Sequence, residues 1–146
     1  MWTSRGGDGF DFLGCHLRKR MSGPIWAKRH QRVYFLQRWP SQRAMHRVHQ
    51  RVKALTPRAV CHRDLRPTIA QLNPVLRGWG AYFRTGNAAI KFGQVDDYVA
   101  WRLKRLLLKR HGRDVRPGQA ARWTPDFFHA LGLHRLRGTI RYPEAA

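Results

Sequence analysis

The sequence predicts a mainly α-helical fold, in which a three-helix bundle is preceded by a short β-hairpin and followed by a small α/β tail. Three observations predict this fold. Apolar residues recur every three or four positions in three stretches between residues 41 and 112, which is the period of an amphipathic helix. Alternating apolar runs precede these stretches, and a shorter helix-and-strand pattern follows them. The chain has 146 residues, enough for one domain with a sizeable core.

The segment before the bundle predicts a β-hairpin. Residues 1–8 are rich in glycine and polar groups, and we expect them to form a disordered lead-in. From Gly9 to Leu17 apolar side chains alternate, which predicts one short strand. A turn signal follows at residues 22–24, and residues 33–36 form a second β-like run. We therefore expect a hairpin over about residues 10–36.

The first predicted helix follows Pro40, with Ser41 as a candidate N-cap and Thr56-Pro57 at its end. Its apolar positions are Ala44 or Met45, Val48, Val52 and Leu55.

The second predicted helix begins at Pro67, a favourable first-turn residue. Its apolar stripe contains Ile69, Leu72, Leu76, Trp79 and Phe83. Pro74 interrupts this helix, and Asn73 is a candidate cap for a restart. Gly78 and Gly80, on either side of Trp79, indicate close approach of another backbone, from protein or RNA.

The third predicted helix has the clearest amphipathic pattern. Its apolar positions are Phe92, Val95, Val99, Leu103 and Leu106, widened by Ile90, Leu107 and Leu108. Asp96 and Asp97 lie near its start, basic residues crowd its end, and Gly112 follows as a C-terminal cap. We interpret this charge order as complementing the helix macrodipole.

The tail predicts a basic loop over residues 113–122, then a short helix with Thr124 as N-cap and Pro125 at its first position. Gly132 could end that helix, and residues 136–142 predict a final short strand.

The charge of the chain indicates a polyanionic partner. Lys and Arg number 29 against 8 Asp and Glu, which gives a formal net charge of +21. Six Trp, four Tyr and seven Phe distinguish the chain from a basic disordered tail. These features favour nucleic acid over a membrane surface. No apolar run is long enough to span a bilayer and no signal peptide is present, so we expect a cytoplasmic protein.

Unpaired cations on the predicted helices give the candidate RNA contacts. A charge run is usually a solvated face, but Arg43, Arg47 and Arg51 have no carboxylate four residues away. Arginine suits phosphate binding and stacking on unpaired bases. For Trp79 and Tyr82, core packing and stacking on a base both remain open. The predicted RNA-binding residues are Arg43, Arg47, Arg51, Arg77, Trp79, Tyr82, Arg84, Lys104, Arg105 and Lys109.

The chain contains no pattern of residues that predicts catalysis. Asp96-Asp97 is similar to the metal-binding aspartates of polymerases, but it lies in a helical pattern without a third carboxylate. His46 and His49 are three residues apart, and no Cys or carboxylate completes a metal site. We therefore expect no metal, no cofactor and no small-molecule substrate.

Residues 72–84, Leu-Asn-Pro-Val-Leu-Arg-Gly-Trp-Gly-Ala-Tyr-Phe-Arg, resemble the signature of the maturase-specific domain of group II intron-encoded reverse transcriptases. The run from Phe92 to Leu103 is similar to the next helix of that domain. Residues 9–14 resemble the last conserved strand of the reverse transcriptase domain, and residues 123–143 resemble the tail of bacterial members. The resemblance covers about residues 9–142.

The resemblance implies a thumb-like bundle that binds intron RNA and assists its splicing by stabilising RNA structure. It divides the chain into a lead-in (1–8), a hairpin remnant of the palm end (9–39), maturase-specific thumb helices (40–112) and a tail (113–146). The family's palm, with its Asp-Asp motif, would lie before residue 9, so we expect this chain not to be an enzyme by itself. A separate reverse transcriptase palm chain is a further candidate partner. Two alternatives are the terminal part of an active RNA-directed DNA polymerase and a basic structural ribonucleoprotein component.

Overall fold

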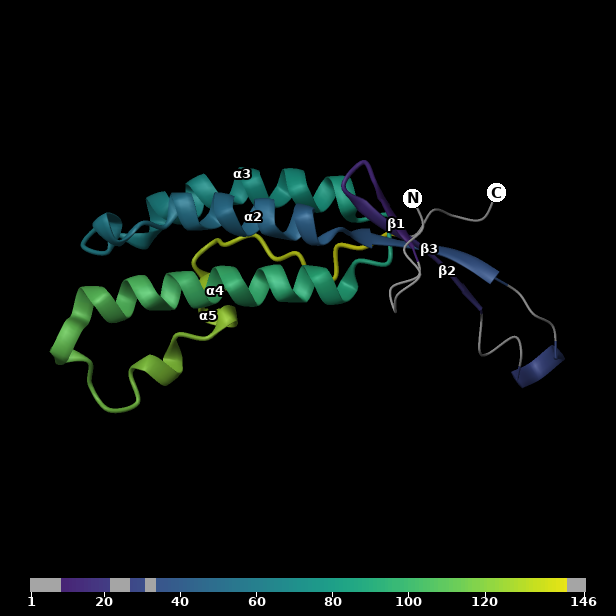
Figure 1. Cartoon of the computed structure of the whole chain (residues 1–146). Helices are drawn as coiled ribbons and strands as arrows, with labels where there is room; N and C mark the ends of the chain where they lie inside the picture. The colour runs from purple at the N-terminus through teal and green to yellow at the C-terminus, as the bar shows by residue number, and fades with distance from the viewer. Residues whose placement is uncertain (1–8, 22–26, 31–33, 142–146) are drawn as a thin grey trace.

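The computed structural model of this chain describes residues 9–21, 27–30 and 34–141, and it is mainly helical with a short antiparallel sheet at one end (Figure 1). This arrangement confirms the predicted fold class. The expected disordered lead-in, residues 1–8, lies outside the described residues. The bundle consists of helices α2 (Gln42–Leu55), α3 (Leu65–Phe83) and α4 (Ala89–His111). A short 3₁₀ turn at Arg58–Val60 lies between α2 and α3, and two more follow α4 at Gly112–Asp114 and Ala120–Arg122.

The sheet contains strands β1 (Phe10–Phe12), β2 (Cys15–Met21) and β3 (Tyr34–Pro40) in that order, each antiparallel to the next. The pairing of β2 with β3 confirms the predicted hairpin. The prediction of one strand over residues 9–17 is wrong, because a tight turn at Leu13-Gly14 divides it. Both turn residues have positive φ, 49° and 81°, as the two-residue turns of β-hairpins require. The extra strand places Phe12 and Leu13 at the tip of the sheet.

Helix α2 begins and ends where the sequence predicts. Ser41 is the N-cap, and its hydroxyl oxygen accepts a hydrogen bond from the Ala44 amide at 3.1 Å. Thr56 ends the helix and donates its hydroxyl to the Val52 carbonyl at 2.8 Å. Arg102 of α4 then donates to the Thr56 carbonyl at 2.6 Å, which ties the end of α2 to the middle of α4. The predicted apolar positions face the core, with Ala44, Met45, Val48 and Val52 buried.

Helix α3 differs from the prediction at two points. It begins at Leu65 with Asp64 as N-cap, two residues before Pro67, which lies in the first turn where backbone N–H groups lack helical partners. It also continues through Pro74 instead of restarting there. Asn73 is therefore not a cap, and its side chain is free to bind the tail.

Helix α4 buries most of its predicted apolar positions: Phe92, Val95, Val99, Leu103, Leu106 and Leu107. The prediction for Ile90 is wrong: it lies two residues before the buried Phe92, on the opposite side of the helix, and is 76% exposed. Leu108 is also exposed. Gly112 ends the helix with a positive φ of 53°, as predicted.

The tail contains helix α5 (Pro125–Ala130), whose predicted N-cap Thr124 accepts a hydrogen bond from the Phe127 amide. The predicted strand at residues 136–142 does not form over its described part, 136–141. This segment instead runs along the bundle toward the sheet, with Leu133 and Leu136 buried (Figure 1). The described helices include none long and apolar enough to cross a membrane.

Candidate nucleic-acid interface

Asp96 anchors the tail to helix α4. Its side chain is buried, and its two carboxylate oxygens accept hydrogen bonds from the backbone amides of Leu136 and Arg137, both at 3.0 Å. The neighbouring Asp97 pairs with the Arg137 guanidinium at 2.9 Å. The macrodipole interpretation of these aspartates is wrong, because the first turn of α4 contains no acidic residue. Both carboxylates instead hold the tail in place, so their role in the fold is structural.

Residues of the Leu-Asn-Pro and Arg-Gly-Trp-Gly motifs hold the tail against helix α3. The Asn73 side chain donates to the Gly132 carbonyl at 2.9 Å and accepts from the His134 amide at 2.8 Å. A Cβ on Gly80 would lie 2.6 Å from a methyl carbon of Leu136, so glycine admits that side chain. The expected close approach of another backbone is wrong, because a side chain approaches Gly80 and Gly78 faces open space.

Arg77 and Arg84 line a cleft that forms only because the tail lies against α3. The cleft has a volume of about 310 Å³, and its other lining residues are Gly80, Ala81, His134, Gly138, Thr139 and Arg141. The Arg141 amide donates to the Arg84 carbonyl at 2.9 Å. Burial and the nearby Arg77 charge lower the pKa of His134. No carboxylate belongs to this lining, so its positive charge can attract a phosphate group.

Arg43, Arg47, Trp79 and Tyr82 come together around a groove between α2, α3 and the β1–β2 turn. The groove has a volume of about 580 Å³, and its lining also includes the apolar side chains of Phe12 and Leu13 and the carboxylate of Asp11, which pairs with His16. Two arginines beside aromatic surface are an arrangement suited to a nucleic-acid strand. The sequence predicts these contacts individually, and the fold groups them.

Trp79 and Tyr82 differ in their contacts and in their exposure within this groove. Trp79 is half-buried and packs on Phe83 and Phe92, with ring centroids 4.9 and 5.4 Å apart, so core packing describes it better than stacking on a base. Its indole N–H has no hydrogen-bond partner among the described residues. Tyr82 is 59% exposed and donates its hydroxyl to the Leu13 carbonyl at 2.6 Å. It therefore ties the β1–β2 turn to α3, a role that sequence reasoning missed.

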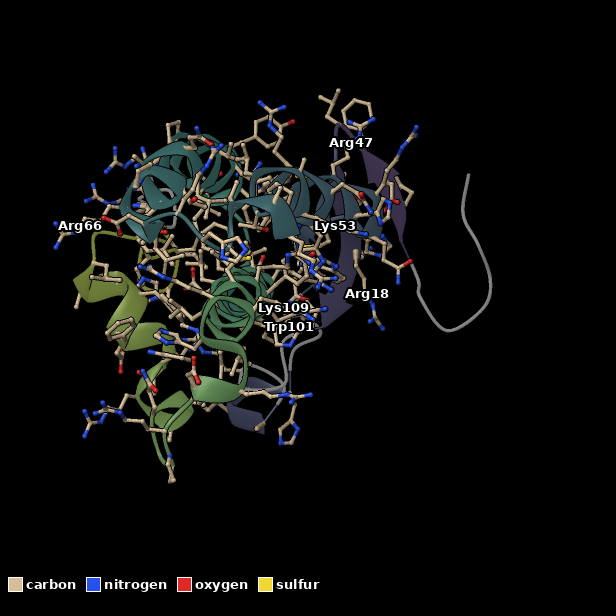
Figure 2. The ribbon with its side chains drawn as sticks, turned by 90° about the vertical axis from the view of Figure 1, so that its left-hand side faces the viewer. Arg18, Arg47, Lys53, Arg66, Trp101 and Lys109 are labelled. Atoms are coloured by element: carbon tan, nitrogen blue, oxygen red, sulfur yellow. The ribbon has the colours of Figure 1, made fainter. Side chains whose placement is uncertain are left out.

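Arg105 and Lys109 lie on the face of α4 that also carries Trp101, because these residues are spaced four apart. Figure 2 shows Trp101 and Lys109 on the same side of the molecule as Lys53 of α2 and Arg18 of β2. Lys104 lies on another side of the helix, one residue out of this register. The three predicted contacts on α4 are therefore divided between two faces.

Sequence reasoning missed the aromatic residues of this face. The guanidinium carbon of Arg105 lies 4.8 Å from the Trp101 ring centroid, and the Trp101 and Tyr98 centroids are 5.9 Å apart. Tyr98 also stacks on His49 of α2, with ring centroids 4.2 Å apart. The available signal was Trp101 four residues before Arg105, a spacing that brings an aromatic ring under a cation.

The predicted contact residues have no acidic partners within the part of the chain that the structure describes. The ion pairs formed among the described residues join Asp11 to His16, Asp126 to Arg135 and Asp97 to Arg137, and none includes a predicted contact. Over the same part of the chain, no three His, Cys, Asp or Glu side chains gather as a metal site would require, and His46 and His49 remain without a third ligand. The surface thus offers cations and aromatic rings for binding.

A comparison with known protein families identifies the family of this chain. The family model of the group II intron maturase-specific domain matches residues 45–123, which is more than half of the chain. This chain belongs to the group II intron maturase-specific domain family. The match spans most of α2 and all of α3 and α4. It ends at Trp123, before the part of the tail that contains Leu136 and Arg141. A comparison with curated proteins found no match.

Proposed function

We propose that this maturase-related chain binds structured group II intron RNA in the cytoplasm and assists splicing by stabilising the folded RNA. The observation that carries this proposal is the set of predicted contact cations that form no ion pair among the described residues and lie on three surfaces of one helical bundle. These surfaces are the Arg43–Arg47 groove, the Arg77–Arg84 cleft and the Trp101 face of α4. Membership of the maturase-specific family supports intron RNA as the polyanion.

The proposed action is binding without chemistry. Asp96 and Asp97, the residues most similar to a catalytic metal pair, are occupied by the Leu136 and Arg137 amides and the Arg137 guanidinium. Releasing them for a metal would detach the tail. We propose on this basis that the chain acts as an RNA-binding maturase module and not as an enzyme by itself. Primer extension with the isolated chain on an RNA template should give no product, and DNA synthesis would favour the polymerase alternative.

Charge reversal on α2 tests the RNA-binding proposal. Replacing Arg43, Arg47 and Arg51 together with glutamate should weaken binding to folded intron RNA strongly, because each loses an attractive phosphate contact and gains repulsion. The matched control reverses Arg18, Lys19 and Arg20 of β2, which changes the net charge equally. Filter binding at fixed salt should give the larger loss for the α2 variant. A larger loss for the β2 variant would mean that RNA binds a different face.

A second candidate partner is a separate reverse transcriptase palm chain. Phe12 and Leu13 at the tip of the sheet are 59% and 71% exposed, and such adjoining apolar residues favour contact with another protein surface. The chain would then serve as the terminal part of an RNA-directed DNA polymerase. Mixing it with a family palm protein should give a complex on gel filtration that Phe12→Ser and Leu13→Ser weaken. No complex with the unaltered chain would remove this candidate.

A further inference from the structure

We propose that the Trp101 face of α4 is a stacking site for an unpaired RNA base, so that part of the bound RNA is single-stranded. This inference rests on the proposed function and deepens it, because it names the form of RNA that this face recognises. Arginine stripes alone bind the phosphates of duplex and single strands alike. An exposed ring instead requires a base that is free to leave its own stack.

Trp101 lies within a ladder of four π systems that crosses from α2 to the outer face of α4. His49 stacks on Tyr98 with an interplanar angle of 18° and a centroid distance of 4.2 Å. Tyr98 adjoins Trp101 at 5.9 Å, and the Arg105 guanidinium lies over the Trp101 ring at 4.8 Å. Contacts with Tyr98 and Arg105 restrict the orientation of the indole, so a base that stacks on the exposed part of the ring costs little side-chain entropy of the protein.

The exposure of Trp101 distinguishes it from other tryptophans of the bundle. Trp101 is 49% exposed, whereas Trp123 is 7% exposed and Trp79 is half-buried against Phe83 and Phe92. The fold therefore leaves a large part of the Trp101 ring for contact with another molecule. The alternative is that Trp101 and Arg105 form only a surface cation–π pair, which would stabilise the helix slightly and bind nothing.

The charges around the ladder favour a nucleotide as the stacked group. Lys53 and Lys109 lie on the same side of the molecule as Trp101 and add positive charge that attracts the phosphates of a stacked nucleotide (Figure 2). One turn earlier on α4, the carboxylate of Asp97 is neutralised by Arg137 at 2.9 Å. A cationic groove with an aromatic platform is the combination by which proteins bind single strands.

The inner end of the ladder supports the same reading. His49 is partly buried, its Nε2 atom has no hydrogen-bond partner among the described residues, and its ring stacks on Tyr98. His49 therefore contributes to the ladder through its ring surface. Tyr98 stacks on His49 and packs against Trp101, so it can position Trp101 without touching the RNA.

Binding of the full chain to two labelled RNAs tests the inference. One RNA is a single-stranded oligonucleotide, and the other is a blunt duplex of the same length. Trp101→Ala should lower affinity for the single strand about tenfold or more and leave duplex affinity nearly unchanged. Trp101→Phe should keep most of the single-strand affinity, because it keeps an aromatic ring. The matched control is Ile90→Ala, which removes a more exposed apolar side chain from the same helix and should change neither affinity.

Equal losses for the two RNAs, or equal effects of Trp101→Ala and Ile90→Ala, would overturn the stacking site. If the unaltered chain bound neither RNA, the proposed function itself would fail, so the two failures are distinguishable. A second measurement uses the unaltered chain, so its outcome does not depend on whether a substituted chain folds. An oligonucleotide that carries 2-aminopurine should lose fluorescence when the unaltered chain binds it, because stacking quenches that base. Binding without any change in its fluorescence would also overturn the inference.

Discussion

The contact between the tail and the bundle differs from the sheet in how many of its polar and apolar groups find partners within the chain. The tail contact, formed by Asn73, Gly80, Asp96 and Leu136, gives two backbone amides a buried carboxylate and fits an apolar side chain over a glycine. The sheet instead presents exposed Phe12 and Leu13. The difference indicates that the tail belongs to the core of the domain, whereas the sheet tip is available for a further partner.

The largest predicted effect removes the acceptor at the tail contact. Asp96→Ala should destabilise the fold by about 2–4 kcal/mol, because the amides of Leu136 and Arg137 lose their partners where water cannot easily replace them. The control, Asp97→Ala, breaks an exposed ion pair and should cost less than about 1 kcal/mol. Urea unfolding followed by circular dichroism measures both. Similar losses for the two variants would show that Asp96 does not anchor the tail.

The two glycines beside Trp79 provide a matched pair for the same contact. Gly80→Ala should destabilise the fold by about 1 kcal/mol, since its Cβ would overlap Leu136 and outweigh the better helix propensity of alanine. Gly78→Ala meets no atom within 4 Å and should stabilise α3 by roughly 0.5–1 kcal/mol. Thermal unfolding of the two variants should therefore move in opposite directions. A shift of the same sign in both would contradict the packing of Leu136 on Gly80.

A smaller effect should appear with pH. Burial lowers the pKa of both His49 and His134 below the usual 6.5, so the folded state holds these rings neutral more strongly than the unfolded state does. The unfolded chain then binds protons first as pH falls, and stability should decrease below about pH 6.5. The urea midpoint should be lower at about pH 5.5 than at about pH 7.5, and His49→Phe should reduce the difference. An unchanged pH dependence in that variant would exclude His49 as a contributor.

The smallest effect on stability is expected at the sheet tip. Replacing Phe12 and Leu13 with serine should change the free energy of unfolding by less than about 0.5 kcal/mol for each residue, because both side chains are mostly exposed. The same changes should lower binding of a hydrophobic dye and reduce self-association in sedimentation experiments. A loss of stability as large as that of Asp96→Ala would mean that the sheet tip belongs to the core after all.

The sequence predicts the parts of this fold that depend on local patterns. Ser41 and Thr124 begin helices and Gly112 ends one at the expected places, because capping depends on residues within one turn. The tail could not be predicted in this way. Leu136 lies in an apolar alternation that favours a strand, but acceptors and space supplied by the distant Asp96 and Gly80 decide its conformation.

The candidate site was predictable to a similar degree. Charge patterning identifies Arg43 and Arg47 correctly as exposed cations, and the fold adds that they share a groove with Tyr82. Charge patterning also names Lys104 and Arg105 as contacts, and the helix places them on different sides. Trp101 lies two residues from Val99 and from Leu103, which places it off the predicted apolar stripe of the helix. Its spacing of four residues before Arg105 was a signal that sequence reasoning did not use.

The most direct test of the central claim is the salt dependence of the affinity for folded intron RNA. If several unpaired cations neutralise phosphates at once, the logarithm of the association constant should fall linearly with the logarithm of the salt concentration. The expected loss is roughly a thousandfold between about 50 and 200 mM monovalent salt. An affinity that stays constant over this range would contradict the account, because the surface cations would then not be the residues that bind the RNA.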